Sequence, residues 1–173
     1  SNDGGTSNVD GSVSDPIGDG GSTGCVSTAK CIADNLDEPY ICRHKGEPCL
    51  ALKSPTCPLV FGNYHDENTV YFGAFLTVPE TAPLSEMSTL NVRLAVDEFN
   101  STNGFPGGAL GKYRPLAAVV CRNDPSQMDA GATHLINDVG THAVVAHLSS
   151  ANLKTLVANY AHPNKTLVIN PGF

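Results

Sequence analysis

Between residues 70 and 170 the chain alternates between short apolar runs and longer segments with helical periodicity. The apolar runs are rich in β-branched and aromatic residues and have the length of strands. The segments between them repeat apolar side chains every three or four positions, as amphipathic helices do. The predicted strands are 70–78, 116–121, 143–148 and 166–170, and the predicted helices are 84–100, 126–139 and 150–160.

This alternation predicts one α/β domain. Strand–helix–strand units of this length force parallel pairing with right-handed crossovers and place helices on both faces of the sheet. The expected fold is a doubly wound parallel sheet, a flavodoxin-like half lobe with the order βαβαβαβ. In the first helix the apolar positions at helical spacing, which an amphipathic helix turns towards the core, are Met87, Leu90, Leu94, Ala95 and Phe99.

The first 24 residues have a different composition. They contain seven glycines, four aspartates and no basic residue, with only Val9, Val13 and Ile17 as larger apolar side chains. Such a segment cannot bury enough apolar surface to offset its ordering entropy, so residues 1–24 are predicted to be a flexible tether. The Asp-Gly spacing does not follow the order of an EF-hand loop, which argues against a specific calcium site.

Five of the six cysteines lie within residues 25–57, whereas Cys121 stands far downstream. There is no CxxC pair, so disulfides are favoured over a metal site, and a short segment with few aliphatic residues needs covalent cross-links. Six cysteines allow fifteen connectivities. The isolation of Cys121 predicts a bond to Cys57, the nearest cysteine to the α/β body, and within the small unit we favour Cys25–Cys42 and Cys31–Cys49.

Charge argues against a nucleic-acid partner, and hydropathy argues against a membrane-spanning segment. Ten Lys and Arg against 17 Asp and Glu give a net charge of −7, and no basic cluster is present, so nucleic acid is not an expected partner. No apolar run approaches the roughly 20 residues that span a bilayer. Oxidised cysteines predict an exported protein, so we expect any export signal to have been removed before Ser1.

A ligand site is predicted at the carboxyl edge of the sheet, where open parallel sheets bind ligands. The strand exits are 77–81, 122–125, 149–152 and 171–173. The third is the most informative, because Ser149 and Ser150 lie where a helix begins. Hydroxyls and unpaired backbone N–H groups at that point suit an anion. The alternative is that one of the two serines only caps the helix, and from the local sequence capping is favoured.

Other candidate chemistry is weaker. The segment 107–112 resembles a phosphate loop but lacks its first glycine and its Ser/Thr. His134, His142 and His147 show no metal-ligand spacing, so structural or surface roles are expected. No nucleophile elbow surrounds Ser149. The sequence therefore predicts a binding protein that is not an enzyme and that uses no metal or cofactor.

Several segments together resemble a known family. They are FGAFLT at 72–77, RLAVDEFNSTNGF at 93–105, NDP at 123–125 with LIND at 135–138, VVAHLSS at 144–150 and LVINPG at 167–172. The chain from Val70 resembles the amino-terminal part of lobe one of a type I periplasmic binding protein, of the leucine/isoleucine/valine-binding branch. Ala146 departs from the pattern, where the family usually has glycine.

The resemblance implies positions for the ligand. In that family the serines after the third strand and the loop after the fourth receive the carboxylate and ammonium groups of an amino acid. Carried over by position, Ser150 and Ser149 would hold the carboxylate. Asn170, Pro171 and Gly172 would offer backbone contacts. This shifts the balance for the serines from capping towards ligand binding.

The resemblance also implies an organisation and a function. We expect a tether at 1–24, a disulfide unit at 25–57 and the first part of lobe one at 58–173, with the solute clamped against a second lobe in the full-length protein. The implied function is that of an exported receptor, periplasmic or on the cell surface and membrane-tethered, which delivers an amino acid or similar small polar solute to the permease of an ABC transporter. The alternatives are an extracellular sensory or interaction domain of the same fold and, less favoured, a serine hydrolase.

Overall fold

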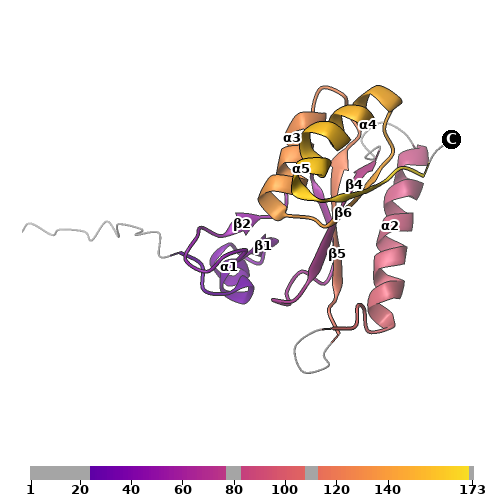
Figure 1. The fold of residues 1–173 in the computed structure, drawn as a ribbon. Coiled ribbons are helices and arrows are strands. Elements are labelled where there is room, and N and C mark those ends of the chain that lie inside the picture. The colour runs from indigo at the N-terminus through magenta and orange to yellow at the C-terminus, as the bar shows by residue number, and fades with distance from the viewer. Residues whose placement is uncertain (1–23, 77–82, 108–112, 172–173) are drawn as a thin grey trace, which may run out of the picture.

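The computed structural model describes residues 24–76, 83–107 and 113–171, without the side chains of 83–86. The predicted tether therefore lies outside the described residues, apart from Gly24. The described chain forms a mixed α/β structure with a five-stranded, mostly parallel sheet and three disulfides (Figure 1). The strands of this sheet are β3 (Leu59–Gly62), β4 (Val70–Leu76), β5 (Leu116–Arg122), β6 (Ala143–Ala146) and β7 (Leu167–Ile169).

The strand order is β3-β5-β4-β6-β7. The four predicted strands are present and pair in parallel, with β4 between β5 and β6. The prediction of an entirely parallel sheet is wrong, because β3 pairs antiparallel with β5, Leu59 opposite Val120. A four-residue strand carries too little periodicity to be distinguished from a loop by pattern alone.

Helices cover both faces of this sheet (Figure 1). Helix α2 (Pro83–Ser101) packs on β3, β5 and β4. The opposite face carries two helical segments, each part α-helix and part π-helix, which correspond to the predicted helices 126–139 and 150–160. They are α3 (Met128–Ala132) with η2 (Thr133–Val139), and α4 (Ser150–Leu156) with η3 (Val157–Ala161) and α5 (His162–Asn164).

The predicted apolar face of α2 is wrong. Met87, Leu90 and Leu94 are 56%, 48% and 56% exposed, whereas Val96 is fully buried. Ala95 is also exposed and Phe99 is half-buried. The helix carries two apolar stripes, and the one with the smaller residues packs inwards, where Val92 contacts a cluster of Ala74, Leu76 and Val120.

The cysteine-rich segment forms its own small structure, with α1 (Thr28–Asp34) and an antiparallel hairpin of β1 (Tyr40–Ile41) and β2 (Leu50–Ala51). The three predicted disulfides, Cys25–Cys42, Cys31–Cys49 and Cys57–Cys121, are all present. The pairing predicted from the position of Cys121 is thereby confirmed. Cys57 and Cys121 are fully buried, so this bond lies inside the core.

Packing connects the cysteine-rich segment to the sheet. Ile41 and Leu52 belong to the same buried cluster as Phe75 of β4. The ring nitrogen Nε2 of His134 lies 2.9 Å from the carbonyl oxygen of Leu52. Arg43 donates hydrogen bonds to the carbonyls of residues 137 and 138, at the end of η2. Residues on both sides of the predicted boundary at 57/58 therefore share one core, and the boundary itself stays a prediction.

Candidate functional site

The exits of β5 and β6 are both attached to the end of β4. The backbone N–H of Asn123 donates to the carbonyl of Leu76 at 2.8 Å, and that of His147 donates to the carbonyl of Phe75 at 3.2 Å. Since β4 lies between β5 and β6, the two exit loops meet over its carboxyl end. The carboxyl edge of the sheet therefore has the convergent loops that the sequence analysis placed there. The exit predicted at 77–81 lies outside the described residues.

Asn123 joins these two loops directly. Its side-chain nitrogen Nδ2 donates a hydrogen bond to the carbonyl oxygen of His147, which is the first residue after β6. Both residues are half-buried. From the sequence, Asn123 was part of the NDP motif at 123–125 and was not predicted to be a site residue. Its position as the first residue after a buried strand was the available signal.

The two serines have different surroundings. Ser149 is the N-cap of α4, where its hydroxyl accepts a hydrogen bond from the N–H of Asn152 at 3.4 Å. Ser150 is the first residue of the helix and is exposed. Among the described residues nothing hydrogen-bonds to the Ser150 hydroxyl. The capping interpretation therefore holds for Ser149, while the hydroxyl of Ser150 faces solvent at a helix start.

The exit of β7 lies beside that of β6. Val145 pairs with Ile169, so Asn170 follows the end of β7 next to the end of β6. Asn170 and Pro171 are exposed, and Gly172 lies outside the described residues. The structure therefore brings Asn170 and Pro171 to the same edge as Ser149 and Ser150.

Hydrogen-bond acceptors lie on the β5 exit. The Asp124 carboxylate accepts bonds from the backbone N–H of Ser126 at 2.9 Å and from its hydroxyl at 2.8 Å. These bonds, the backbone one first, hold the pKa of the Asp124 carboxyl below its ordinary value. The side-chain oxygen Oε1 of Gln127 is buried, and no described residue donates to it. The edge therefore offers a carboxylate besides the serine hydroxyl, whereas the Gln127 oxygen is enclosed by protein.

The three histidines do not form a metal site. His134 is buried against Leu52 and lies 3.6 Å from Asp138, which is a structural position. Within the described ranges, no three or more His, Cys, Asp and Glu residues gather so that they could hold a metal ion. Likewise, no helix in the described part of the chain is long and apolar enough to cross a membrane.

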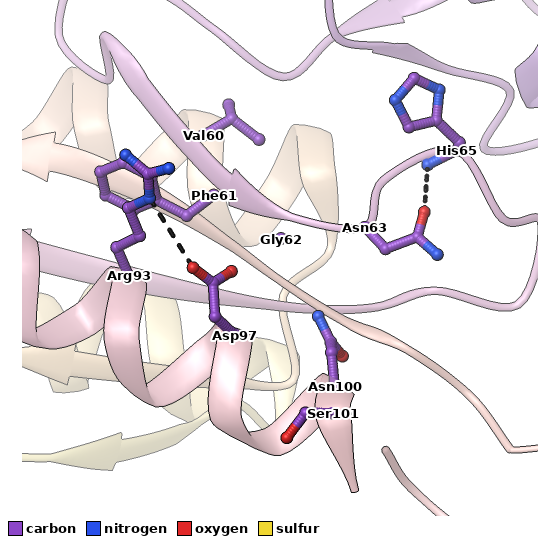
Figure 2. Close-up of a pocket in the computed structure, with 9 residues that line it drawn as sticks. All are labelled: Val60, Phe61, Gly62, Asn63, His65, Arg93, Asp97, Asn100 and Ser101. Carbon is purple, nitrogen blue, oxygen red and sulfur yellow. Dashed lines mark hydrogen bonds and ion pairs between the residues drawn. The ribbon is translucent and has the colours of Figure 1, made fainter. Parts of the chain in front are cut away.

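A pocket of about 680 Å³ lies elsewhere, between β3 and α2 (Figure 2). It was not predicted from the sequence. Most of its polar side chains already have hydrogen-bond or ion-pair partners. Arg93 pairs with Asp97 at 3.7 Å, and the Asn100 carboxamide binds the backbone of Leu116, accepting at 2.8 Å and donating at 2.9 Å. This groove therefore serves mainly to join α2 to the sheet.

Comparisons of the chain with protein-family models, with curated proteins and with solved structures found no match.

Proposed function

We propose that this chain is the amino-terminal part of an exported receptor for an amino acid or a similar small polar solute. Residues 58–173 would form the first part of lobe one of a binding protein similar to the type I periplasmic family. The solute would lie at the carboxyl edge of the sheet, against a second lobe of the full-length protein. The receptor would deliver it to the permease of an ABC transporter, without catalysis.

The observation that carries this proposal is the convergence of polar exit loops over the end of β4. The parallel strands, numbered along the chain, lie in the order 2-1-3-4. This is the order of a doubly wound, flavodoxin-like sheet, in which ligands bind where the order reverses. That point lies between β4 and β6, and the β6 exit carries Ser149 and Ser150.

The chemistry of the edge suits a zwitterion. The exposed hydroxyl of Ser150 and the N–H groups at the start of α4 can donate to a carboxylate. The Asp124 carboxylate on the β5 exit can accept from an ammonium group. Backbone groups of Asn170 and Pro171 lie at the same edge. Both charges of an amino acid would thus find partners there.

The three disulfides support export to an oxidising compartment. A segment of residues 1–24 with the composition of a flexible linker would fit a receptor tethered to a membrane, in the periplasm or at the cell surface.

The test is a binding screen of the full-length gene product, including whatever follows Phe173. Thermal-shift measurements with the twenty amino acids, followed by calorimetry, should identify at least one ligand. Ser150→Ala should then weaken binding by about tenfold or more, because a hydrogen bond to a charged group is lost. Its melting temperature should stay unchanged, since Ser150 does not cap the helix.

Ser149→Ala is the matched control. Removing an N-cap costs about 1 kcal/mol of stability, so this variant should melt earlier. A full-length protein that binds no amino acid would overturn the proposed function. If Ser150→Ala binds the solute as tightly as the wild type, this serine is not a ligand residue.

A further inference from the structure

The carboxamide of Asn123 spans the end of the central strand. The neighbours of β4 are β5, which ends one residue before Asn123, and β6, which ends one residue before His147. The backbone N–H of Asn123 binds β4 at Leu76, and its side chain binds the carbonyl of His147. One residue therefore cross-links the carboxyl ends of three adjacent strands.

The loop that receives this hydrogen bond is short. After β6, residues 147–149 lead directly to the first residue of α4. The His147 N–H binds the carbonyl of Phe75, so β4 holds the peptide group between residues 146 and 147. The bond from Asn123 to the His147 carbonyl holds the next peptide group, between residues 147 and 148. The direction of this second peptide group determines where the cap residue Ser149 and the hydroxyl of Ser150 lie.

Asn123, the donor of this hydrogen bond, follows a strand end that is bound to the cysteine-rich segment. Cys121, two residues before Asn123, is joined to Cys57 by the buried disulfide. Between them, the backbone N–H of Arg122 donates to the carbonyl of Thr56 at 2.9 Å. The end of β5 is therefore held by residues 56 and 57, and the Asn123 N–H binds it to β4, so Asn123 can transmit that rigidity to the β6 exit.

We propose that Asn123 is a positioning residue for the solute site. Its carboxamide holds the His147 carbonyl and thereby sets the start of α4, so that the Ser150 hydroxyl and the first helical N–H groups face the solute carboxylate. The residue acts through the loop and does not contact the solute. This inference rests on the proposed function, because it assigns the role within that site.

The experiment compares two asparagines whose side chains bind backbone groups, Asn123 in the loop after β5 and Asn100 near the end of α2. Asn123→Ala removes the bond at the carboxyl edge, and Asn123→Asp keeps the shape but removes the donor. The control is Asn100→Ala, which deletes two side-chain hydrogen bonds to the backbone of Leu116, at the start of β5. Each variant is made in the full-length protein and in residues 1–173.

Two measurements separate positioning from stability. In the full-length protein, calorimetry with the amino acid identified by the screen should show about tenfold weaker binding for both Asn123 variants. Asn100→Ala should lower the melting temperature and leave the dissociation constant unchanged. In residues 1–173, hydrogen exchange of the 147–153 backbone amides should speed up in the Asn123 variants and not in Asn100→Ala.

The outcomes distinguish the two proposals. If the wild type binds an amino acid and the Asn123 variants bind it equally well, Asn123 has only a structural role and the inference fails. If the wild type binds none, the proposed function fails, and hydrogen exchange decides whether Asn123 holds the loop. Unchanged exchange in both Asn123 variants overturns the inference in either case. Should Asn123→Ala fail to fold, Asn123→Asp provides the same comparison.

Discussion

Neighbouring polar residues at the carboxyl edge differ in what already binds them. The Ser149 hydroxyl caps α4, whereas that of Ser150 has no partner among the described residues. The carboxylate of Asp124 accepts two bonds from Ser126, whereas the buried Oε1 of Gln127 accepts none from the described chain. At this scale, the exposed Ser150 hydroxyl is the serine group that the local turn leaves available to a solute.

The hydrogen bonds between Ser126 and the Asp124 carboxylate lead to a prediction about the pKa of that carboxyl. The hydrogen bonds from Ser126 favour the charged carboxylate, so NMR should find a pKa below the ordinary aspartate value of about 3.9. Because the folded-state pKa is the lower one, the stabilisation is complete above the unfolded-state pKa and is lost as the pH falls through the folded-state pKa.

Ser126→Ala is the corresponding test. It removes the hydroxyl bond but keeps the backbone N–H, so the pKa of Asp124 should rise only part of the way back. A pKa in the wild type at or above the ordinary value would contradict the turn geometry.

At the scale of elements, α2 has two apolar stripes, and only one of them is buried against the sheet. The larger Met and Leu side chains face outwards, and the stripe that includes Val92 and Val96 packs on the sheet. The apolar cluster below contains Ala74, Leu76 and Val120, with Leu59 and Phe61 packed against it. The hydrophobicity of the helix alone therefore does not decide which of its sides is buried.

This orientation predicts unequal effects of two substitutions on α2. Val96→Ala removes two buried methyl groups and should lower the free energy of unfolding by about 2 kcal/mol. Leu94→Ala removes a larger but exposed side chain and should change it by less than about 0.5 kcal/mol. Denaturant unfolding under oxidising conditions measures both, and the reverse order would show that the helix is turned the other way.

At the scale of the whole molecule, one disulfide joins the cysteine-rich segment to the sheet. Cys57 and Cys121 are separated by 64 residues, and that interval includes β3, β4 and α2. The other two disulfides close intervals of 17 and 18 residues within the amino-terminal segment. Cys57–Cys121 therefore constrains the unfolded chain more than either of the others.

Removing this bond should destabilise the protein strongly. For a loop of 64 residues, the chain-entropy model gives a loss of about 4 kcal/mol when Cys57 and Cys121 are both replaced by Ala. The double variant Cys25→Ala/Cys42→Ala should lose less, about 3 kcal/mol. Denaturant midpoints of the two variants provide the comparison, and equal losses would show that loop length does not dominate.

A second prediction at this scale follows from the proposal that the solute site needs a second lobe. Residues 1–173 alone should bind amino acids very weakly, because the carboxyl edge of one sheet leaves the other side of the solute in water. Calorimetry with the same amino acids as in the screen of the full-length protein tests this. Micromolar binding by residues 1–173 would show that one lobe suffices, and the assumed second lobe would then be unnecessary.

The amino-acid sequence by itself determined much of the secondary structure, because periodicity and helix-start signals are local. The strands at β4 and β5, the helix at α2 and the helix start at Ser149 could be predicted from adjacent residues. The Cys57–Cys121 bond also followed from the sequence, since five cysteines are clustered and the sixth is isolated. The other two pairings were favoured but did not follow from that argument. Ser150 was identified as a ligand candidate from its place after a strand.

Only the tertiary structure decided which distant residues meet. The antiparallel pairing of Leu59 with Val120 and the inward side of α2 depend on surfaces that form only when the sheet assembles. The hydrogen bond from Asn123 to His147 likewise depends on two strand exits meeting over a third strand. A local pattern shows only how apolar and polar positions alternate within one segment. Which strand or helix packs against that segment depends on contacts between segments that are distant in the sequence.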